Sequence, residues 1–152
     1  MNTFFIFSAE YLFLLPVIIL GGYFFAKSWR EWGRLALFAI PTGLLTYLLG
    51  FVGSLLYYDP RPFVVSHFTP LISHTADNGF PSDHTLLVAA FATVGMYWNK
   101  WLGVVLWAIT LLVAVSRVYV GVHHFVDVFA SMVFALIAVF VWRLIMYRLW
   151  KT

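Results

Sequence analysis

The sequence has no cysteine and very few charged residues. The absence of cysteine excludes a disulfide framework and any catalytic or metal site that depends on a thiolate. Only 10% of the 152 residues are charged, whereas 63% are hydrophobic and 20% are aromatic. A mean hydropathy of +0.93 places the chain in the membrane class, and its length predicts one domain over residues 1–152.

The positions of the few charges exclude two further classes. The net charge is +3, but the basic residues are scattered near the ends of apolar stretches and form no stripe, so we expect no nucleic-acid partner. The N-terminus has no basic segment before its first apolar run, and no small-residue cleavage site follows that run. We therefore expect the first apolar stretch to stay in the membrane.

Five apolar stretches are candidates for membrane crossings, since about 20 apolar residues span the hydrocarbon core of a bilayer. They cover residues 3–26, 35–56, 85–98, 101–115 and 125–147. The third and fourth are short, so we expect their polar ends at or just below the membrane surface. The sequence predicts an all-α integral membrane protein, with a bundle of about five transmembrane helices in contact with the lipid bilayer.

The basic residues and tryptophans give this bundle an orientation. Nine Lys and Arg residues are present, and only Arg61 and Arg117 fall on one side of the predicted bundle. The other side holds Lys27, Arg30, Arg34, Lys100, Arg143, Arg148 and Lys151, together with Trp29, Trp32, Trp98, Trp101, Trp142 and Trp150. By the positive-inside rule the richer side is cytoplasmic, which predicts an outside N-terminus and an inside C-terminus.

Three segments that are far apart in the sequence arrive at the opposite, outer face. They are the run after the second apolar stretch, the start of the third, and the connection between the fourth and fifth. The long connection over residues 57–82 lies there too, and loops of this length are often functional or disordered. Together they bring Asp59, Arg61, Ser82, Asp83, His84, Ser116, Arg117, His123 and Asp127 to one side.

The side chains of this outer group suit phosphate chemistry. Two arginines make forked contacts with phosphate oxygens, and a serine that opens a helix presents a hydroxyl and free backbone N–H groups to an anion. His123 and Asp127 are four residues apart, so on a helix the carboxylate can fix the tautomer of the imidazole and stabilise its charged form. His84 can serve as a general acid. The set fits attack by an imidazole on phosphorus.

The spacing of these residues resembles the signatures of the type 2 phosphatidic acid phosphatase (PAP2) superfamily. Arg61-Pro62 is similar to the end of the first signature and Pro81-Ser82-x-His84 to the second. Ser116-Arg117-x5-His123-x3-Asp127 is similar to the third, which is specific because four positions stand at set spacing. The resemblance covers roughly residues 57–127.

This resemblance implies a role for each residue. His123 is expected to be the nucleophile that forms a phosphohistidine, and Asp127 is expected to orient it. His84 is expected to protonate the leaving group and later to activate water. The predicted phosphate-binding set is Arg61, Arg117, Ser82, Asp83 and Ser116, although Ser116 is equally compatible with a hydrogen bond at the helix end. Members of the family need no metal, and we expect no cofactor.

Two positions depart from the family pattern. Ser54 stands where the first signature usually has a lysine, and Asp83 stands where the second usually has a glycine. An anion beside a phosphate is unfavourable unless an arginine or a proton offsets it. The runs Pro-Ser-Asp-His-Thr and Asp-Pro-Arg-Pro-Phe nevertheless resemble the bacitracin-resistance branch. Its members are undecaprenyl-diphosphate phosphatases, which recycle the cell-wall lipid carrier outside the bacterial cytoplasmic membrane.

Other functions stay open on the sequence alone. The substrate could instead be phosphatidic acid, phosphatidylglycerol phosphate or lipid A, or the enzyme could be a lipid phosphotransferase. From other classes, the chain could be a small transporter or a structural membrane subunit. A transporter is disfavoured because the apolar stretches are nearly free of charge and show no paired repeats.

Several polar residues near the outer group are expected to have ordinary roles. His124 is a rival nucleophile, but Val128 is its i+4 neighbour, so we expect it to face a neighbouring helix or the interface. His67 and His74 are expected to be solvated loop residues, with substrate contact as the lesser alternative. Asp59 is expected to be a turn residue, with a lesser chance of pairing with Arg61, and residues 77–79 are expected to form a turn.

Overall fold

A computed structural model describes residues 1–149, and each predicted apolar stretch is helical, which confirms the all-α prediction. Trp150 and Lys151, expected at the cytoplasmic end, lie outside the described residues. Across residues 1–149 the one departure from helix and loop is an isolated bridge between Pro60 and Asn78. The helices are α1 (Asn2–Glu10), α2 (Leu14–Phe25), α3 (Trp29–Leu56), α4 (Pro62–Val65), α5 (Asp83–Trp98), α6 (Lys100–Tyr119) and α7 (Phe125–Leu149).

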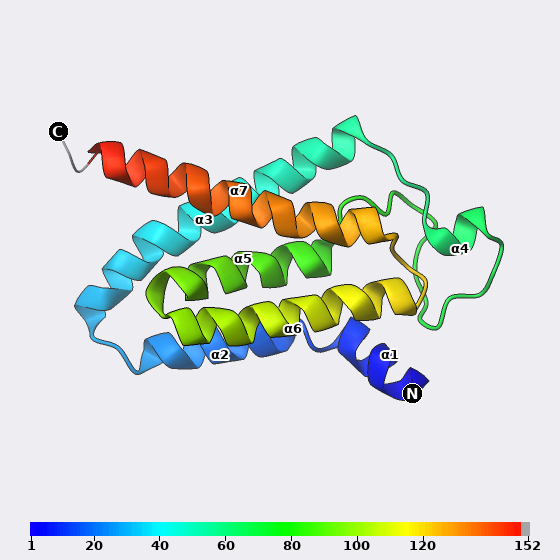
Figure 1. The fold of residues 1–152 in the computed structure, drawn as a ribbon, viewed down its shortest axis with the longest axis horizontal. Coiled ribbons are helices and arrows are strands. Elements are labelled where there is room, and N and C mark those ends of the chain that lie inside the picture. The colour runs from blue at the N-terminus through cyan, green and yellow to red at the C-terminus, as the bar shows by residue number, and fades with distance from the viewer. Residues whose placement is uncertain (150–152) are drawn as a thin grey trace.

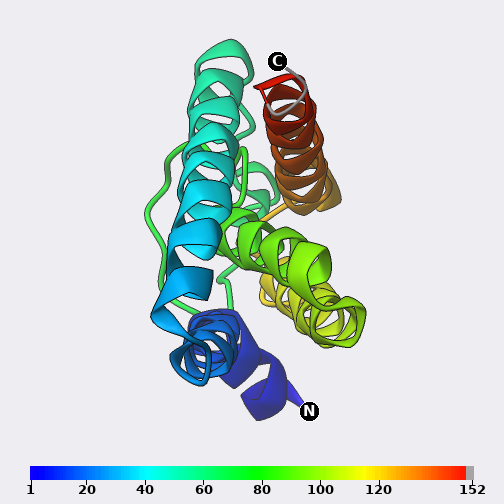
Figure 2. The ribbon, with the colours of Figure 1, turned by 90° about the vertical axis from the view of Figure 1, so that its left-hand side faces the viewer.

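The helices pack around α5, which lies in the middle of the bundle (Figures 1 and 2). It packs most extensively against α6 and α7 and also contacts α3 and α2. Its buried face carries small residues, including Ala89, Ala92 and Gly95. A Cβ atom at Gly103 in α6 would overlap the backbone of Met96 in α5, so glycine is what allows α5 and α6 to approach this closely.

Three helices, α3, α6 and α7, are each long and apolar enough to cross a membrane. Large hydrophobic side chains on them, such as Leu55, Leu111 and Phe140, are exposed, as expected for a surface that lipid surrounds. The central α5 has 16 residues, which is about 24 Å at the rise of an α-helix and shorter than a hydrocarbon core of about 30 Å. These features describe a multi-pass membrane protein.

The first predicted crossing is not one straight helix. The axes of α1 and α2 differ by 54°, with the break over residues 11–13. Pro16 lies in the first turn of α2, where its missing amide hydrogen is tolerated. In a continuous helix the carbonyl of Leu12 would lack its donor at Pro16, and here it accepts instead from the N–H of Leu15 (3.0 Å). The expected crossing over residues 3–26 is therefore a bent pair of helices.

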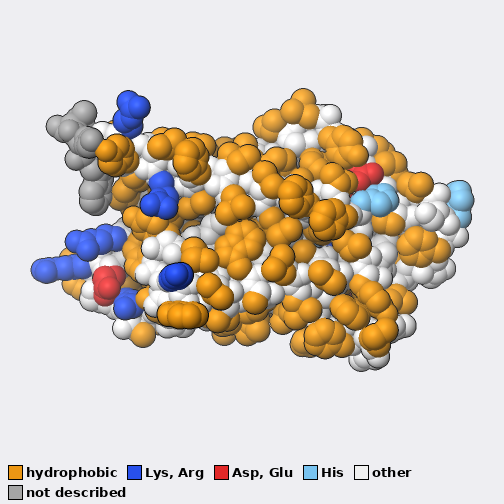
Figure 3. Space-filling view, viewed as in Figure 1, with side chains coloured by type: hydrophobic (Ala, Val, Ile, Leu, Met, Phe, Trp, Pro, Cys, Tyr) orange, Lys and Arg blue, Asp and Glu red, His pale blue; other side chains and the backbone are white. Residues whose placement is uncertain are grey.

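Charged side chains separate along the long axis of the molecule (Figure 3). Lysine and arginine gather at one end of the visible face, and histidine lies at the opposite end. The start of α1 lies near the histidine end and the last turns of α7 lie at the basic end (Figure 1). This is the separation that the positive-inside rule associates with a membrane-spanning orientation.

Candidate active site

His123 lies at the centre of a group of polar side chains at the histidine-rich end. It follows Gly121, whose φ of +83° lets the chain turn back between α6 and α7. The side chain is 3% exposed, with Nδ1 2.9 Å from the carbonyl oxygen of Gly79 and 3.2 Å from Asp127 Oδ2. Both neighbours are acceptors, so Nδ1 carries the ring proton and Nε2 keeps its lone pair.

Two buried arginines face this lone pair. Arg61 Nη1 lies 3.4 Å from Nε2 of His123, and Arg117 Nη2 lies 3.3 Å from it. Arg61 is anchored by its Nε–H, which donates to Asp77 Oδ1 at 2.7 Å, and by Nη1, which donates to the carbonyl of Val122 at 2.9 Å. A lone pair and two guanidinium groups therefore converge on one point from three separate segments of the chain.

Arg117 keeps one buried donor without a partner. Its Nη1 donates to the carbonyl of Ala9 at the end of α1, at 3.3 Å. Its Nε is buried, and no acceptor lies within reach among residues 1–149. A buried polar group without a partner costs about 1–3 kcal/mol, so it calls for an explanation such as a bound ligand. An anion with several oxygens would satisfy Nε and also contact Arg61.

Burial lowers the pKa of the His123 imidazole, and the nearby Arg117 and Arg61 lower it further. The hydrogen bond to Asp127 acts in the opposite direction but does not reverse the shift. The ring is therefore neutral at neutral pH. This is the protonation state in which Nε2 can attack an electrophile.

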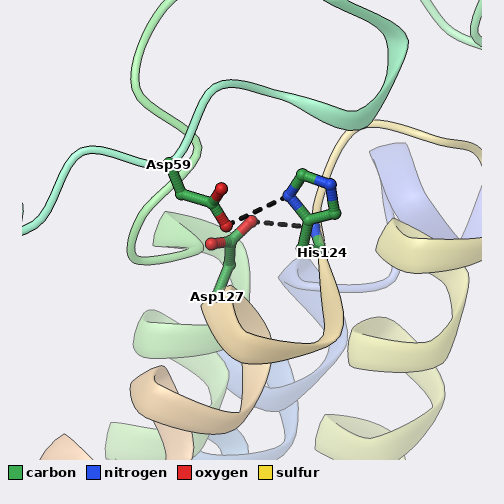
Figure 4. Close-up of side chains that lie close together, drawn as sticks. All are labelled: Asp59, His124 and Asp127. Carbon is green, nitrogen blue, oxygen red and sulfur yellow. Dashed lines mark hydrogen bonds and ion pairs between the residues drawn. The ribbon is translucent and has the colours of Figure 1, made fainter. Parts of the chain in front are cut away.

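Asp127 is positioned by His124, which in turn pairs with Asp59 (Figure 4). Its Oδ2 accepts from the backbone N–H of His124 at 2.8 Å, and His124 Nδ1 lies 3.0 Å from Asp59 Oδ2. Burial and the negative charge of Asp127 raise the pKa of the Asp59 carboxyl. A proton on Asp59 would provide a donor for Asp127 Oδ1, which is buried and otherwise unpaired within the described chain.

These same three side chains are also the one group among residues 1–149 with the spacing of a metal site. One ligand atom from each of Asp59, His124 and Asp127 lies within 4.8 Å of the others. However, His124 Nδ1 is already paired with Asp59, and Asp127 already accepts from His124 and His123. The hydrogen bonds of the protein therefore use most of the atoms that a metal ion would need.

The start of α5 brings three predicted residues towards the cluster. Ser82 is fully buried, and its hydroxyl accepts from Thr85 at 3.2 Å and does not cap the helix. Asp83 is exposed and interacts electrostatically with Arg117. The ring of His84 stands edge-on to Phe13, with 4.7 Å between ring centroids, on the side of the α1–α2 bend. His84 also interacts electrostatically with Arg117 and His123, so it borders the same space.

The hydroxyl of Ser116 is used inside its own helix. It donates to the carbonyl of Leu112 at 2.7 Å, and the side chain has no exposed surface. Of the two roles that the sequence allows for Ser116, the helix hydrogen bond is the one observed. Its hydroxyl proton is therefore already used and is not offered to a phosphate.

Four residues for which the sequence predicts ordinary roles lie in or beside the site: Asp59, His74, Asp77 and His124. Asp59 pairs with His124 and not with Arg61, whose partner is Asp77. His124 therefore faces the long loop instead of a neighbouring helix. The ring of His74 lies 6.2 Å from that of His123, between centroids. Three of these four belong to the long connection over residues 57–82, whose length and polarity are the only sequence signals that point to them.

Comparison with known proteins identifies relatives of this chain. Residues 32–151 match the model of the PAP2 superfamily. The undecaprenyl-diphosphatase BcrC of Bacillus subtilis is 33% identical over 138 residues, which cover 90% of this chain and 70% of that protein. The residues that match the family model, 32–151, include Arg61, Gly79, Arg117, His123 and Asp127.

Two solved structures share the fold. LpxE of Aquifex aeolicus has a TM-score of 0.74 at 23% identity, over 93% of this chain and 84% of its own. A transmembrane PAP2 type phosphatidylglycerolphosphate phosphatase from Bacillus subtilis has a TM-score of 0.67 at 25% identity, over 97% of this chain and 77% of its own. The arrangement of helices described above is therefore that of membrane proteins already solved.

Proposed function

The chain belongs to the PAP2 superfamily, and from this premise we propose that it hydrolyses undecaprenyl diphosphate, or a closely related prenyl diphosphate, to the monophosphate and inorganic phosphate. It is a membrane hydrolase of the lipid phosphatase type. The observation that carries the proposal is the convergence of Arg61 and Arg117 on the unprotonated Nε2 of His123. Lipid carrier recycling at the bacterial cytoplasmic membrane is the role that fits this reaction.

In the first step, Nε2 of His123 attacks the terminal phosphorus. The bond from that phosphorus to the bridging oxygen breaks, and the prenyl phosphate leaves with a proton from His84, whose charged form is favoured by the negative charge of the bound substrate. Arg61 and Arg117 stabilise the charge on the equatorial oxygens, because their donors are already in place before the reaction. Asp127 and the Gly79 carbonyl hold the Nδ1 proton while the ring carries the phosphoryl group.

In the second step, water attacks the phosphohistidine from the side that the leaving group has vacated. His84, now neutral, accepts a proton from this water and thus returns to its starting charge. The P–N bond breaks, inorganic phosphate forms, and His123 regains its lone pair on Nε2. Each group therefore ends in the state in which it began.

An apolar cavity beside the site supports a lipid substrate. It has a volume of about 890 Å³ and runs between α3 and α5, with Gly50, Phe51 and Leu86 in its wall and Asp83 and Asn78 at the polar end. The cavity is not enclosed, and Tyr47 and Phe51 of α3, which line it, are exposed, so it opens onto the apolar face of the bundle. A long hydrocarbon tail fits such a cavity while the phosphates lie at its polar end.

The test is phosphate release from undecaprenyl diphosphate by the purified chain in detergent. His123→Ala should abolish release, and a radiolabelled terminal phosphate should be trapped on the wild-type protein after acid-free quenching. The same assay with phosphatidic acid and phosphatidylglycerol phosphate measures kcat/KM for the alternatives, of which the second is favoured by the solved relative from Bacillus subtilis. A higher kcat/KM for either would contradict the proposed substrate, and full activity of His123→Ala would contradict the nucleophile.

A further inference from the structure

His74 lies beside the proposed nucleophile although it belongs to the long loop between α4 and α5. Its ring centroid is 6.2 Å from that of His123, and the two ring planes are nearly perpendicular at 76°. Its neighbours Ser73 and Thr75 are exposed, whereas His74 is partly buried. The loop therefore places this one imidazole beside the ring of His123 and close enough to Arg61 and Arg117 to interact with their charges.

The loop is anchored on both sides of His74. On one side, Ile72 is buried against Ala9, Val120 and Val122, and the backbone N–H of Leu71 donates to the carbonyl of Val120 at 3.0 Å. This anchoring means that the imidazole does not depend on a free loop for its position.

On the other side, the hydroxyl of Thr75 donates to Asp77 Oδ2 at 2.7 Å. The other carboxylate oxygen of Asp77 accepts from Arg61 Nε at 2.7 Å. Thr75, the residue after His74, is thus connected through Asp77 to Arg61, one of the two arginines that face His123.

His74 has a buried nitrogen that no group among residues 1–149 satisfies. Its Nδ1 is buried and has no hydrogen-bond partner in the described part of the chain. Burial lowers the pKa of the His74 ring, and the charges of Arg61 and Arg117 lower it further. The backbone of Thr75 acts in the opposite direction, with smaller effect. The charged and titratable groups around His74 are Arg61, Arg117, His123 and His84, together with the carboxylate of Asp77.

An anion bound between His74, Arg61 and Arg117 would satisfy the unpaired donors and reduce the electrostatic repulsion among these groups. It would give the His74 Nδ1 and the Arg117 Nε an acceptor, and its negative charge would offset the repulsion that the arginines exert on a protonated imidazole. No lysine lies in the segments that form this end of the molecule, so a histidine is the remaining source of a third cation.

We propose that His74 is a third phosphate-binding side chain, which donates from its ring to a non-bridging oxygen of the phosphoryl group that His123 attacks. The proposal rests on the proposed function, since it assigns a further ligand of the same site. Two arginines and His74 then surround the equatorial oxygens, while His84 remains on the side of the leaving group. Phosphate binding is accompanied by uptake of a proton, because the bound anion raises the pKa of His74.

Binding of inorganic phosphate to the purified full chain in detergent tests this directly. Isothermal titration calorimetry near neutral pH in two buffers of different ionisation enthalpy gives both the Kd and the number of protons taken up. His74→Asn should weaken phosphate binding about 10-fold, the effect of losing one hydrogen bond to a charged group, and should reduce the proton uptake. It should also raise KM for the lipid more than it lowers kcat.

His67→Asn is the matched control. His67 belongs to the same loop but is exposed, and asparagine tolerates its φ of 52°. This variant should leave the Kd for phosphate and the proton uptake unchanged. His74→Gln, which restores a donor on a longer side chain, should recover part of the affinity without the proton uptake.

Three results would overturn the proposal. The first is a His74→Asn protein with the phosphate affinity and proton uptake of the wild type. The second is an equal loss of affinity in His67→Asn. The third is a fall in the Tm of the phosphate-free His74→Asn protein that accounts for the whole loss of activity, which would mark His74 as structural. If the wild type neither binds phosphate nor releases it from any lipid phosphate, the proposed function itself is wrong.

Discussion

The carbonyl oxygen of Gly79 lies 2.9 Å from Nδ1 of His123, closer than the 3.2 Å between the same nitrogen and Asp127 Oδ2. A backbone acceptor and a carboxylate thus share the ring proton. The carbonyl fixes the tautomer of the ring, and the carboxylate adds a negative charge. These two contributions can be separated by substitution.

Asp127→Asn should reduce kcat about 10²-fold and leave measurable activity. In hydrolytic triads the loss of the carboxylate costs about 10⁴-fold because the imidazole adopts the wrong tautomer. Here the backbone N–H of His124 donates to Oδ2 at 2.8 Å, which favours the amide oxygen at that position, and Gly79 also holds the correct tautomer. Phosphate release in single-turnover and steady-state assays measures the effect. Activity as low as that of His123→Ala would mean that the carbonyl does not suffice.

Gly79→Ala should lower kcat about 10-fold. A Cβ atom there would lie 3.1 Å from Asp127 Oδ2 and 3.2 Å from the carbonyl oxygen of Asp59, so the carboxylate must shift by a few tenths of an ångström. Small displacements of a positioned catalytic group reduce rates strongly. Gly22→Ala is the control, because a Cβ atom there meets nothing within 4 Å. Equal kinetics of the two variants would show that the approach of Gly79 to Asp127 is unimportant.

The value of kcat/KM should rise with pH through an ionisation below the ordinary histidine pKa of about 6.5, and it should fall again at higher pH as His84 loses the proton that it gives to the leaving group. The rise at low pH occurs because burial lowers the pKa of His123 and only the neutral ring is a nucleophile. The interaction with Asp127 raises this pKa, so Asp127→Asn should move the acid limb to still lower pH. If the acid limb of the pH profile of Asp127→Asn stays at the same pH or moves to higher pH, the assignment of this ionisation to His123 is contradicted.

The orientation of the bundle can be measured because the chain has no native cysteine. Ser66→Cys lies in the connection between α4 and α5, and Lys100→Cys lies at the first residue of α6, at the opposite end. Both positions are exposed. A membrane-impermeant maleimide should label the Ser66→Cys protein in cells with an intact cytoplasmic membrane. It should label Lys100→Cys only after permeabilisation, and the reverse pattern would invert the proposed orientation.

The contacts that the sequence predicts are those set by local spacing. His123 and Asp127 are four residues apart, and the structure places Nδ1 and Oδ2 in contact although α7 begins only at Phe125. The meeting of Arg61 and Arg117 is expected because helix count and charge bias bring both to one membrane face. In each case a short-range pattern or a topological rule was enough.

The contacts that the sequence does not predict depend on the path of the long loop or on the backbone. His74 and Asp59 lie in a connection without periodicity, so nothing in their spacing indicates what they face. The acceptor at Gly79 is a carbonyl, which every residue type has. The bend between α1 and α2 follows from Pro16, but the apolar run around it has no interruption that hydropathy would register.

The cavity between α3 and α5 opens on the apolar face of the bundle, and this has a kinetic consequence. A lipid that enters there arrives by two-dimensional diffusion within one leaflet, without passing through water. The quantity that saturates the enzyme is then the mole fraction of substrate in the membrane. Adding inert detergent or phospholipid at constant bulk substrate should lower the rate, which is the behaviour known as surface dilution.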